Sequence, residues 1–178
     1  MRRTQTAHYT PESDAYFDAI VAALRGAILL TKQDKKEWAQ RHGIEFLGAG
    51  MDRTVFGVPE GALKIDWRGD DNEREAHVWT HANERLRQSL VPVIATAPDY
   101  RWLLMERVSP LRAGREPRLL ADGSVAWHYA SDCGIGDTRP ANISADGRLL
   151  DYSRVNWPGK LNDCAPGWQG WSQGRSRR

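Results

Sequence analysis

The side chains best suited to chemistry lie between residues 137 and 151. Asp137 and Asn142 stand five residues apart in a stretch whose proline predicts a loop, and Asp151 follows a short apolar run. Carboxylate and amide oxygens suit Mg²⁺, which takes one or two protein oxygens and completes its octahedron with water and phosphate. Asn142 and Asp151 could ligate such an ion and leave Asp137 to accept a proton from an attacking hydroxyl group. Asp137 and Asn142 could instead only cap a turn.

A second candidate group comes earlier in the chain. Gly48 and Gly50 follow a strand-like segment, and glycines at such a turn let the backbone approach a ligand and point N–H groups at phosphate oxygens. Lys64 stands in a short apolar run, where a strand would turn its side chain to the face opposite Leu63 and Ile65. The ammonium could neutralise phosphate beneath the glycine turn. The glycines would serve an ordinary hairpin equally well, and Lys64 could lie on a solvated face.

A buried Lys64 would need a carboxylate partner when no ligand is present. The helix predicted after it offers Glu73 and Glu75. Glu75 lies four residues before Trp79, on the apolar stripe that also includes Leu86, whereas Glu73 points elsewhere. Glu75 is therefore the expected partner of Lys64, unless it only marks the edge of an amphipathic helix.

The sequence pattern supplies helices and strands that could position these residues. Thr10 as a cap and Pro11 at the first helical position predict an amphipathic packing helix, and residues 31–41 predict a second. Short runs separated by glycine and proline predict strands, and longer patterned stretches predict further helices. The strands are expected at 46–47, 54–56, 62–65, 91–94 and 102–108, the helices at 71–90 and 119–130, and a hairpin at 146–147.

The composition is that of a globular protein. Of 178 residues, 40% are hydrophobic and 27% charged, which predicts one ordinary domain or one domain with tails. The net charge of +2 is too small to argue for nucleic acid or an anionic membrane. We expect neither a membrane span nor a secretory signal. Two cysteines, Cys133 and Cys164, make neither a disulfide scaffold nor a zinc site, so a reducing cytoplasm fits best.

Taken in order, these motifs resemble those of the protein-kinase-like fold over roughly residues 44–155, most nearly the small protein kinases encoded by bacteriophages. The segment from Asp137 to Asn142 resembles the catalytic loop, and Asp151-Tyr-Ser resembles the metal-binding Asp-Phe-Gly. Glu106 and Val108 fall where the hinge that holds adenine is expected. Gly48 and Gly50 match glycines of the Gly-rich loop, and Val55 matches the valine that follows it. Lys64 matches the ATP lysine, and Glu75 matches the helix glutamate.

The resemblance implies an α+β fold, with a protein-kinase-like N-lobe made of a five-stranded antiparallel sheet and one helix. Helices precede this lobe, and a strongly reduced helical C-lobe follows it. Residues 1–43 would be an N-terminal helical extension, residues 44–157 a minimal protein-kinase-like domain, and residues 158–178 a Gly/Trp/Arg-rich tail without helical or strand period.

The resemblance also implies transfer of a phosphoryl group from ATP, with Mg²⁺, to a hydroxyl group of serine or threonine in a protein. The location would be the cytoplasm, and the host cytoplasm if a phage encodes the chain. The implied roles are phosphate binding by Lys64 held by Glu75, magnesium ligation by Asn142 and Asp151, orientation of the hydroxyl by Asp137, and charge stabilisation by Arg139.

The chain departs from the kinase pattern at several positions. Arg53 replaces the third loop glycine and could contact phosphate or close the loop; Ile135-Gly136 replaces the His-Arg before the catalytic aspartate, and Ser153 replaces the last glycine of Asp-Phe-Gly. Only 27 residues follow Asp151, too few for the helices that position peptide substrates. Two alternatives therefore stay open: a nucleotide-binding pseudokinase that inhibits or recruits a host protein, and a small-molecule phosphotransferase. We expect a protein substrate or partner and no membrane, and a nucleic acid only if the basic tail binds one.

Overall fold

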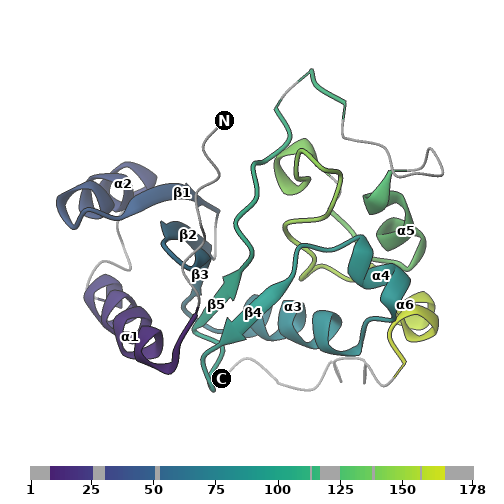
Figure 1. Cartoon of the computed structure of the whole chain (residues 1–178), viewed down its shortest axis with the longest axis horizontal. Coiled ribbons are helices and arrows are strands. Elements are labelled where there is room, and N and C mark those ends of the chain that lie inside the picture. The colour runs from purple at the N-terminus through teal and green to yellow at the C-terminus, as the bar shows by residue number, and fades with distance from the viewer. Residues whose placement is uncertain are drawn as a thin grey trace. The chain divides into compact units, whose positions relative to one another are not determined.

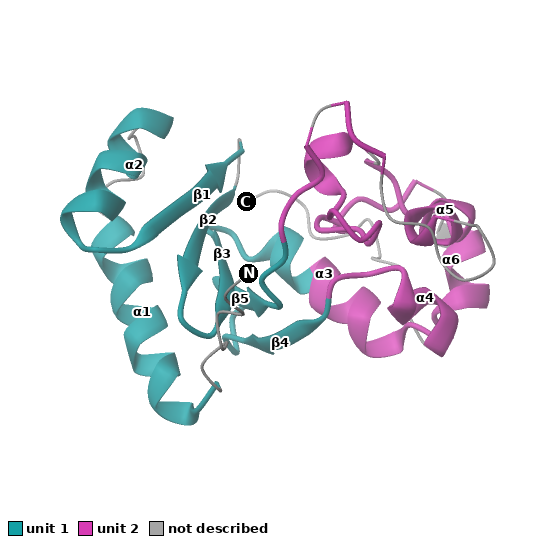
Figure 2. Ribbon diagram, turned by 45° about the horizontal axis from the view of Figure 1, so that its top comes forward, with its two compact units in different colours: residues 1–73, 92–108 teal, residues 74–91, 109–178 magenta. Residues whose placement is uncertain are grey.

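The computed structural model describes residues 9–25, 31–50, 53–112, 114–116, 125–137, 139–156 and 158–166 (Figure 1). The fold is α+β, with a five-stranded antiparallel sheet and several helices. The chain divides into two compact units: unit 1 comprises residues 1–73 and 92–108, and unit 2 comprises residues 74–91 and 109–178 (Figure 2). The division passes through helix α3 (Asp70–His81).

Unit 1 contains the sheet, whose strands follow the order β1-β2-β3-β5-β4. Helix α3 and the following short helix separate β3 from β4 in sequence, and it is β5 that pairs with β3. All five strands lie at the predicted places, with ends shifted by a few residues. Their bounds are Glu45–Ala49 for β1, Arg53–Val58 for β2, Gly61–Asp66 for β3, Val93–Thr96 for β4 and Trp102–Met105 for β5.

The two faces of the sheet differ because side chains alternate along each strand. Phe56, Leu63 and Leu104 are cross-strand neighbours on one face and belong to the hydrophobic core of unit 1. Helices α1 (Pro11–Arg25) and α2 (Lys32–Arg41) complete this core with the buried side chains Phe17, Ile20, Val21, Leu24, Trp38 and Ala39. The N-terminal helices are therefore packing elements, as predicted, and the opposite face of the sheet carries the candidate lysine.

Side-chain caps set where the helices begin. The Thr31 hydroxyl accepts the Asp34 N–H at 3.2 Å, while the Asp34 carboxylate accepts the Thr31 N–H at 2.9 Å, so α2 starts with a capping box. The single helix predicted over 71–90 is wrong. Asn83 accepts the Leu86 N–H at 2.8 Å and starts a separate helix, α4 (Glu84–Gln88). An asparagine at this point interrupts the pattern because its side chain competes for helix N–H groups.

Unit 2 contains α4, α5 (Ala126–Asp132), α6 (Pro158–Cys164) and a 3₁₀ turn (Pro140–Asn142). Helix α5 matches the end of the helix predicted at 119–130, of which residues 119–124 lie outside the described residues. Helix α6 corrects the prediction of a tail without helical period. Its inner face consists of Leu161, Cys164 and the following Ala165, a pattern too short to stand out in the sequence. The Trp/Arg segment from residue 167 onward lies outside the described residues.

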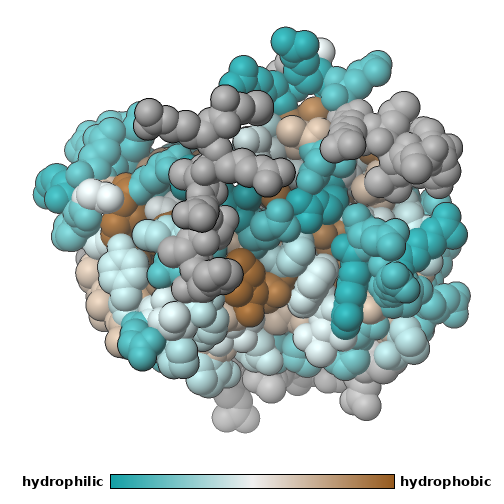
Figure 3. Space-filling model, in the orientation of Figure 1, coloured by the Kyte–Doolittle hydropathy of each residue, from teal (hydrophilic) through white to brown (hydrophobic). Residues whose placement is uncertain are grey.

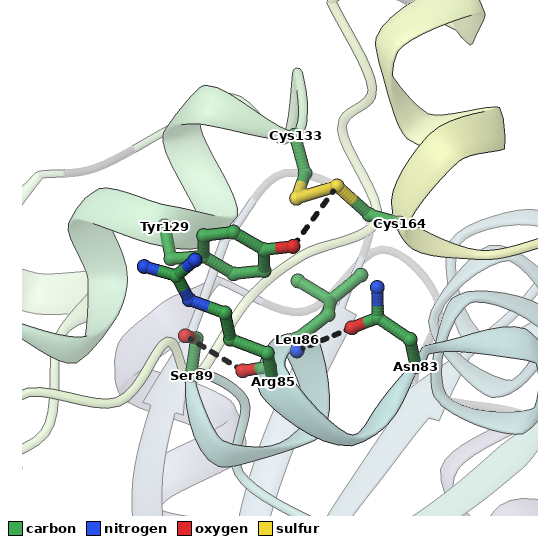
Figure 4. Close-up of a disulfide and its surroundings, with 7 residues drawn as sticks. All are labelled: Asn83, Arg85, Leu86, Ser89, Tyr129, Cys133 and Cys164. Carbon is green, nitrogen blue, oxygen red and sulfur yellow. Dashed lines mark hydrogen bonds between the residues drawn. A yellow bond between two sulfur atoms is a disulfide. The ribbon is translucent and has the colours of Figure 1, made fainter.

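A disulfide joins Cys133, directly after α5, to Cys164, the last residue of α6; their Cα atoms are 6.0 Å apart (Figure 4). The Tyr129 hydroxyl lies 3.7 Å from the Cys164 sulfur, and the Arg85 guanidinium lies 4.3 Å from the centre of the Tyr129 ring. This pairing corrects the interpretation of two cysteines kept reduced. Nothing in the sequence marked it, because 31 residues separate the two cysteines and only the packing of α5 and α6 brings them together.

The surface is mostly polar over the face shown in Figure 3, with a few apolar areas between hydrophilic ones. The large apolar side chains most exposed among the described residues are Tyr16, Leu47 and Ile94, at 41–44% exposure. Single exposed apolar residues are normal on a protein surface. Of the helices in the described part of the chain, none has the length and apolar character needed to cross a membrane.

Candidate functional site

In unit 1, the predicted residues line up across the sheet. Gly48 pairs with Val55, Val55 with Lys64, and Lys64 with Leu103, so these residues form one row on the face opposite the α1 and α2 core. Lys64 is buried, so the alternative that it lies on a solvated face is wrong. We call Gly48, Val55 and Lys64 the glycine–lysine row.

The fold itself does not require glycine at positions 48 and 50. Neither glycine has a left-handed φ, and a Cβ built on either would meet no atom of the described residues within 4 Å, its chain neighbours aside. Gly61 differs, because its added Cβ would lie 2.2 Å from the Met105 carbonyl oxygen. The Gly50 N–H donates to the Arg53 carbonyl at 2.9 Å and closes the β1–β2 turn. The described residues therefore leave room for a ligand to approach the backbone at Gly48 and Gly50.

Asn72 is a buried part of this region that the sequence analysis missed. Its side-chain amide donates to the Lys64 carbonyl at 3.2 Å and to the Tyr100 carbonyl at 2.9 Å. One side chain thus ties β3, at the lysine itself, to the turn before β5. An asparagine in the first turn of a helix usually lies at the surface, so no local signal marked it.

The start of α3 is held by the end of β3. The buried Asp66 carboxylate accepts the N–H of Arg68 at 3.0 Å and that of Asp71 at 2.9 Å, and the Asp71 N–H is a donor that the helix leaves unpaired in its first turn. The guanidinium of Arg53, the residue that replaces the third loop glycine, lies with its Nε 3.9 Å from the Asp71 carboxylate. Arg53 therefore contacts the beginning of α3.

The predicted hinge residues follow β5 directly. The Glu106 N–H donates to the Pro92 carbonyl at 3.0 Å, and both Glu106 and Val108 are partly exposed. Arg107, which stands between them, pairs with Glu45 of β1 at 2.6 Å. The role of Glu106 and Val108 in binding adenine stays a prediction.

In unit 2, a short antiparallel ladder positions the catalytic-loop motif. Residues 134–136 pair with residues 154–156 through two backbone hydrogen bonds of 2.8 Å and a β-bridge. Asp137 follows this ladder with φ of +71°, a left-handed conformation that residues other than glycine seldom adopt. Because residues 154–156 come just after Asp151-Tyr-Ser, the ladder joins the two motifs that lie far apart in sequence.

The acidic residues gather through the loop that joins these motifs. The Asn142 amide donates to the Asp137 carbonyl at 3.2 Å, and the N–H of Leu150, the residue before Asp151, donates to the Asn142 carbonyl at 2.8 Å. Arg139 binds both carboxylate oxygens of Asp137, each at 2.5 Å. Unit 2 thus collects what we call the Asp–Asn–Asp cluster: Asp137, Asn142 and Asp151.

The charges of the cluster act on Arg139. Its hydrogen bond to Asp137 and the charge of that carboxylate raise the pKa of the guanidinium, and the charge of Asp151 adds to the rise. Asp151 therefore lies within Coulombic range of Arg139. The Arg139 side chain is 74% exposed, so water screens its attraction to Asp137 and the pair is easily opened.

Glu75 is fully buried and Glu73 is partly exposed, as helical geometry predicted. Glu75 Oε1 accepts the Tyr152 N–H at 3.1 Å, a contact that the sequence analysis missed. The Ser153 hydroxyl donates to Asp151 Oδ1 at 3.1 Å. Glu75 thus anchors the segment that carries Asp151. The predicted pairing of Glu75 with Lys64 stays a prediction.

The Asp–Asn–Asp cluster has the donor chemistry that Mg²⁺ prefers. Asn142 uses its amide N–H on Asp137, which leaves its carbonyl oxygen as an acceptor, and Asp151 supplies a carboxylate. Two protein oxygens suffice for Mg²⁺ when phosphate and water complete the shell. Within the described ranges, no group of three or more His, Cys, Asp or Glu could hold a metal ion.

No known protein family, no curated protein and no solved structure matches this chain. Its function therefore has to follow from its own residues and their geometry.

Proposed function

We propose that the protein transfers a phosphoryl group from ATP, with Mg²⁺, to a hydroxyl group of serine or threonine in a protein, as a minimal member of the protein-kinase-like fold. The Asp–Asn–Asp cluster carries this proposal. Asp137 and Asp151 are 14 residues apart in sequence, and the bonds through Asn142 and Leu150 bring them into one network. A turn cap would need Asp137 and Asn142 but would not need a link to the segment that carries Asp151.

The topology of unit 1 supports the proposal. A protein-kinase-like N-lobe is expected to be a five-stranded antiparallel sheet with one helix between the third and fourth strands. In this chain α3, followed by the short α4, occupies this place. The glycine–lysine row lies on one face, and the opposite face is closed by α1 and α2. The open space above Gly48 and Gly50 also fits a loop whose backbone approaches phosphate.

In the proposed reaction, Lys64 binds the α and β phosphates and Glu75 holds Lys64. Asn142 and Asp151 hold Mg²⁺, which when bound neutralises charge on the phosphate oxygens. Asp137 accepts a hydrogen bond from the substrate hydroxyl, orients it and takes up its proton. Arg139 leaves Asp137 and stabilises charge on the transferred phosphoryl group. Catalysis of this kind rests on positioning and charge neutralisation.

One observation favours a second candidate, a nucleotide-binding pseudokinase. Arg139 occupies both oxygens of Asp137, so the carboxylate that should orient the hydroxyl is engaged with a cation in this structure. A module that only binds nucleotide and a host protein would have no need of a free Asp137. The test must therefore separate nucleotide binding from phosphoryl transfer.

The test uses radiolabelled ATP with Mg²⁺, the purified protein and a host lysate, together with the melting temperature of the protein with and without MgATP. We expect MgATP to raise the melting temperature, because a ligand that binds only the folded state stabilises it. Asp137→Asn should keep this shift and lower transfer by about 10²–10⁴-fold. Asp151→Asn should lose the Mg²⁺-dependent part of the shift.

Asp163→Asn, at an exposed position of α6, is the matched control and should change neither readout. Binding without transfer in the wild type would establish the pseudokinase. The absence of any shift at millimolar MgATP would remove both candidates.

A further inference from the structure

The segment that carries Asp151 is held from two sides within unit 2. On its N-terminal side, the Leu149 N–H donates to the Ser89 carbonyl and the Val91 N–H donates to the Leu149 carbonyl, both at 2.9 Å. On its C-terminal side, Tyr152 is fully buried and its hydroxyl donates to the Val91 carbonyl at 2.9 Å. The chain around Asp151 is thus fixed twice to the same short segment after α4.

Two further bonds act on the residues next to Asp151. The Tyr152 N–H donates to Glu75, and the buried Ser153 hydroxyl donates to Asp151 Oδ1 itself. Tyr152 therefore cannot turn out of its place without breaking a bond at its backbone and another at its hydroxyl. Breaking them leaves a buried donor and a buried carbonyl without partners, which is costly in a protein interior.

We propose that Tyr152 and Ser153 are positioning residues that hold the Asp151 carboxylate in one orientation before metal binds. This inference rests on the proposed function, in which Asp151 is a magnesium ligand. A phenylalanine would fill the same space as Tyr152 and keep the backbone bond to Glu75, but its side chain would have no hydrogen bond to Val91 to hold it. The bond of the tyrosine hydroxyl to Val91 holds the side chain in place, and the Ser153 hydroxyl fixes the orientation of the Asp151 carboxylate.

Preorganisation of this kind should appear in the dependence of nucleotide binding on metal. An aspartate already in place binds the ion without an ordering cost, whereas a mobile one must be ordered on binding. A purely structural role for Tyr152 would lower stability and affect binding with and without metal alike. The informative quantity is therefore the ratio of ATP affinity in Mg²⁺ to ATP affinity in EDTA.

The experiment measures this ratio by calorimetric titration of ATP into the full chain for the wild type, Tyr152→Phe and Ser153→Ala. We expect each variant to lower the ratio by about 3–10-fold, the equivalent of one hydrogen bond, with affinity in EDTA unchanged. In an Asp151→Asn background, neither variant should lower it further. Tyr129→Phe is the matched control, because its hydroxyl contacts the disulfide instead, and it should leave the ratio unchanged.

The outcomes separate the inference from the function on which it rests. Wild-type protein that binds no ATP, or binds it equally with and without Mg²⁺, would overturn both. Wild-type protein with a clear metal dependence that both variants retain would overturn the positioning role alone and leave the proposed function standing. If Tyr152→Phe fails to fold, Ser153→Ala decides the matter, because it removes only one hydroxyl next to the carboxylate.

Discussion

Reduction of the Cys133–Cys164 disulfide should destabilise the protein by an amount that follows from its position in the chain. The crosslink closes a loop of 31 residues, and in the chain-entropy model such a loop restricts the unfolded state by about 12 cal/mol/K, or about 3.7 kcal/mol at room temperature. In a chain of this length, each kcal/mol corresponds to roughly 2–4 °C, so the melting temperature should fall by about 10 °C.

The assay is a thermal melt of the wild type with and without a phosphine reductant. The double variant Cys133→Ala/Cys164→Ala should melt near the reduced wild type and should not respond to the reductant, which controls for effects of the reductant itself. Both sulfurs are buried, so alanine avoids the polar group that serine would place in the core. The Arg85–Tyr129 contact beside the disulfide is left in place, and the Tyr129 hydroxyl loses only its contact with the Cys164 sulfur (Figure 4).

A count of free thiols completes this test. Unfolded protein that has not been reduced should contain none, because the chain has two cysteines and both are in the disulfide. Two reactive thiols in protein purified under air, or melting curves that coincide with and without reductant, would refute the reasoning. The first result would mean that α5 and α6 do not bring the sulfurs together, and the second that the crosslink does not constrain the unfolded chain.

Three further results are expected. Gly61→Ala should lower the free energy of unfolding by about 1–3 kcal/mol in chemical denaturation, because its Cβ would lie 2.2 Å from the Met105 carbonyl oxygen. Gly48→Ala should keep full stability and weaken ATP binding. Equal loss of stability in both variants would show that the space at Gly48 is not open. Glu75→Gln should lower transfer and cost about 1–3 kcal/mol of stability in chemical denaturation, because it removes the negative charge from the buried group that accepts the Tyr152 N–H. Glu73→Gln should change neither transfer nor stability. The reverse result would mean that the register of α3 is misassigned. Arg139→Gln should lower transfer while nucleotide binding remains, measured by labelled ATP and by calorimetry.

Features set by local pattern were predictable from the sequence. The helix over residues 31–41, the strand that contains Lys64 and the face of α3 that carries Glu75 each agree with the structure, because they depend on neighbours a few residues away. Helix α6 and the disulfide depend on packing between segments far apart in sequence. The same holds for two sets of hydrogen bonds, those of Asn72 to two carbonyls and that of Tyr152 to Val91. No local residue pattern predicts them.

The sign of the Arg139→Gln effect decides whether Arg139 stabilises the transferred phosphoryl group or blocks Asp137. In this structure, Arg139 binds both oxygens of Asp137, which taken alone would favour an inhibited or inactive site. However, the guanidinium is 74% exposed, and exposed ion pairs contribute little because water screens them. Phosphate, with more negative charge than one carboxylate, should therefore draw Arg139 away from Asp137 at small cost. If so, glutamine at this position removes charge stabilisation and transfer falls; if the pair instead blocks Asp137, glutamine frees the carboxylate and transfer rises.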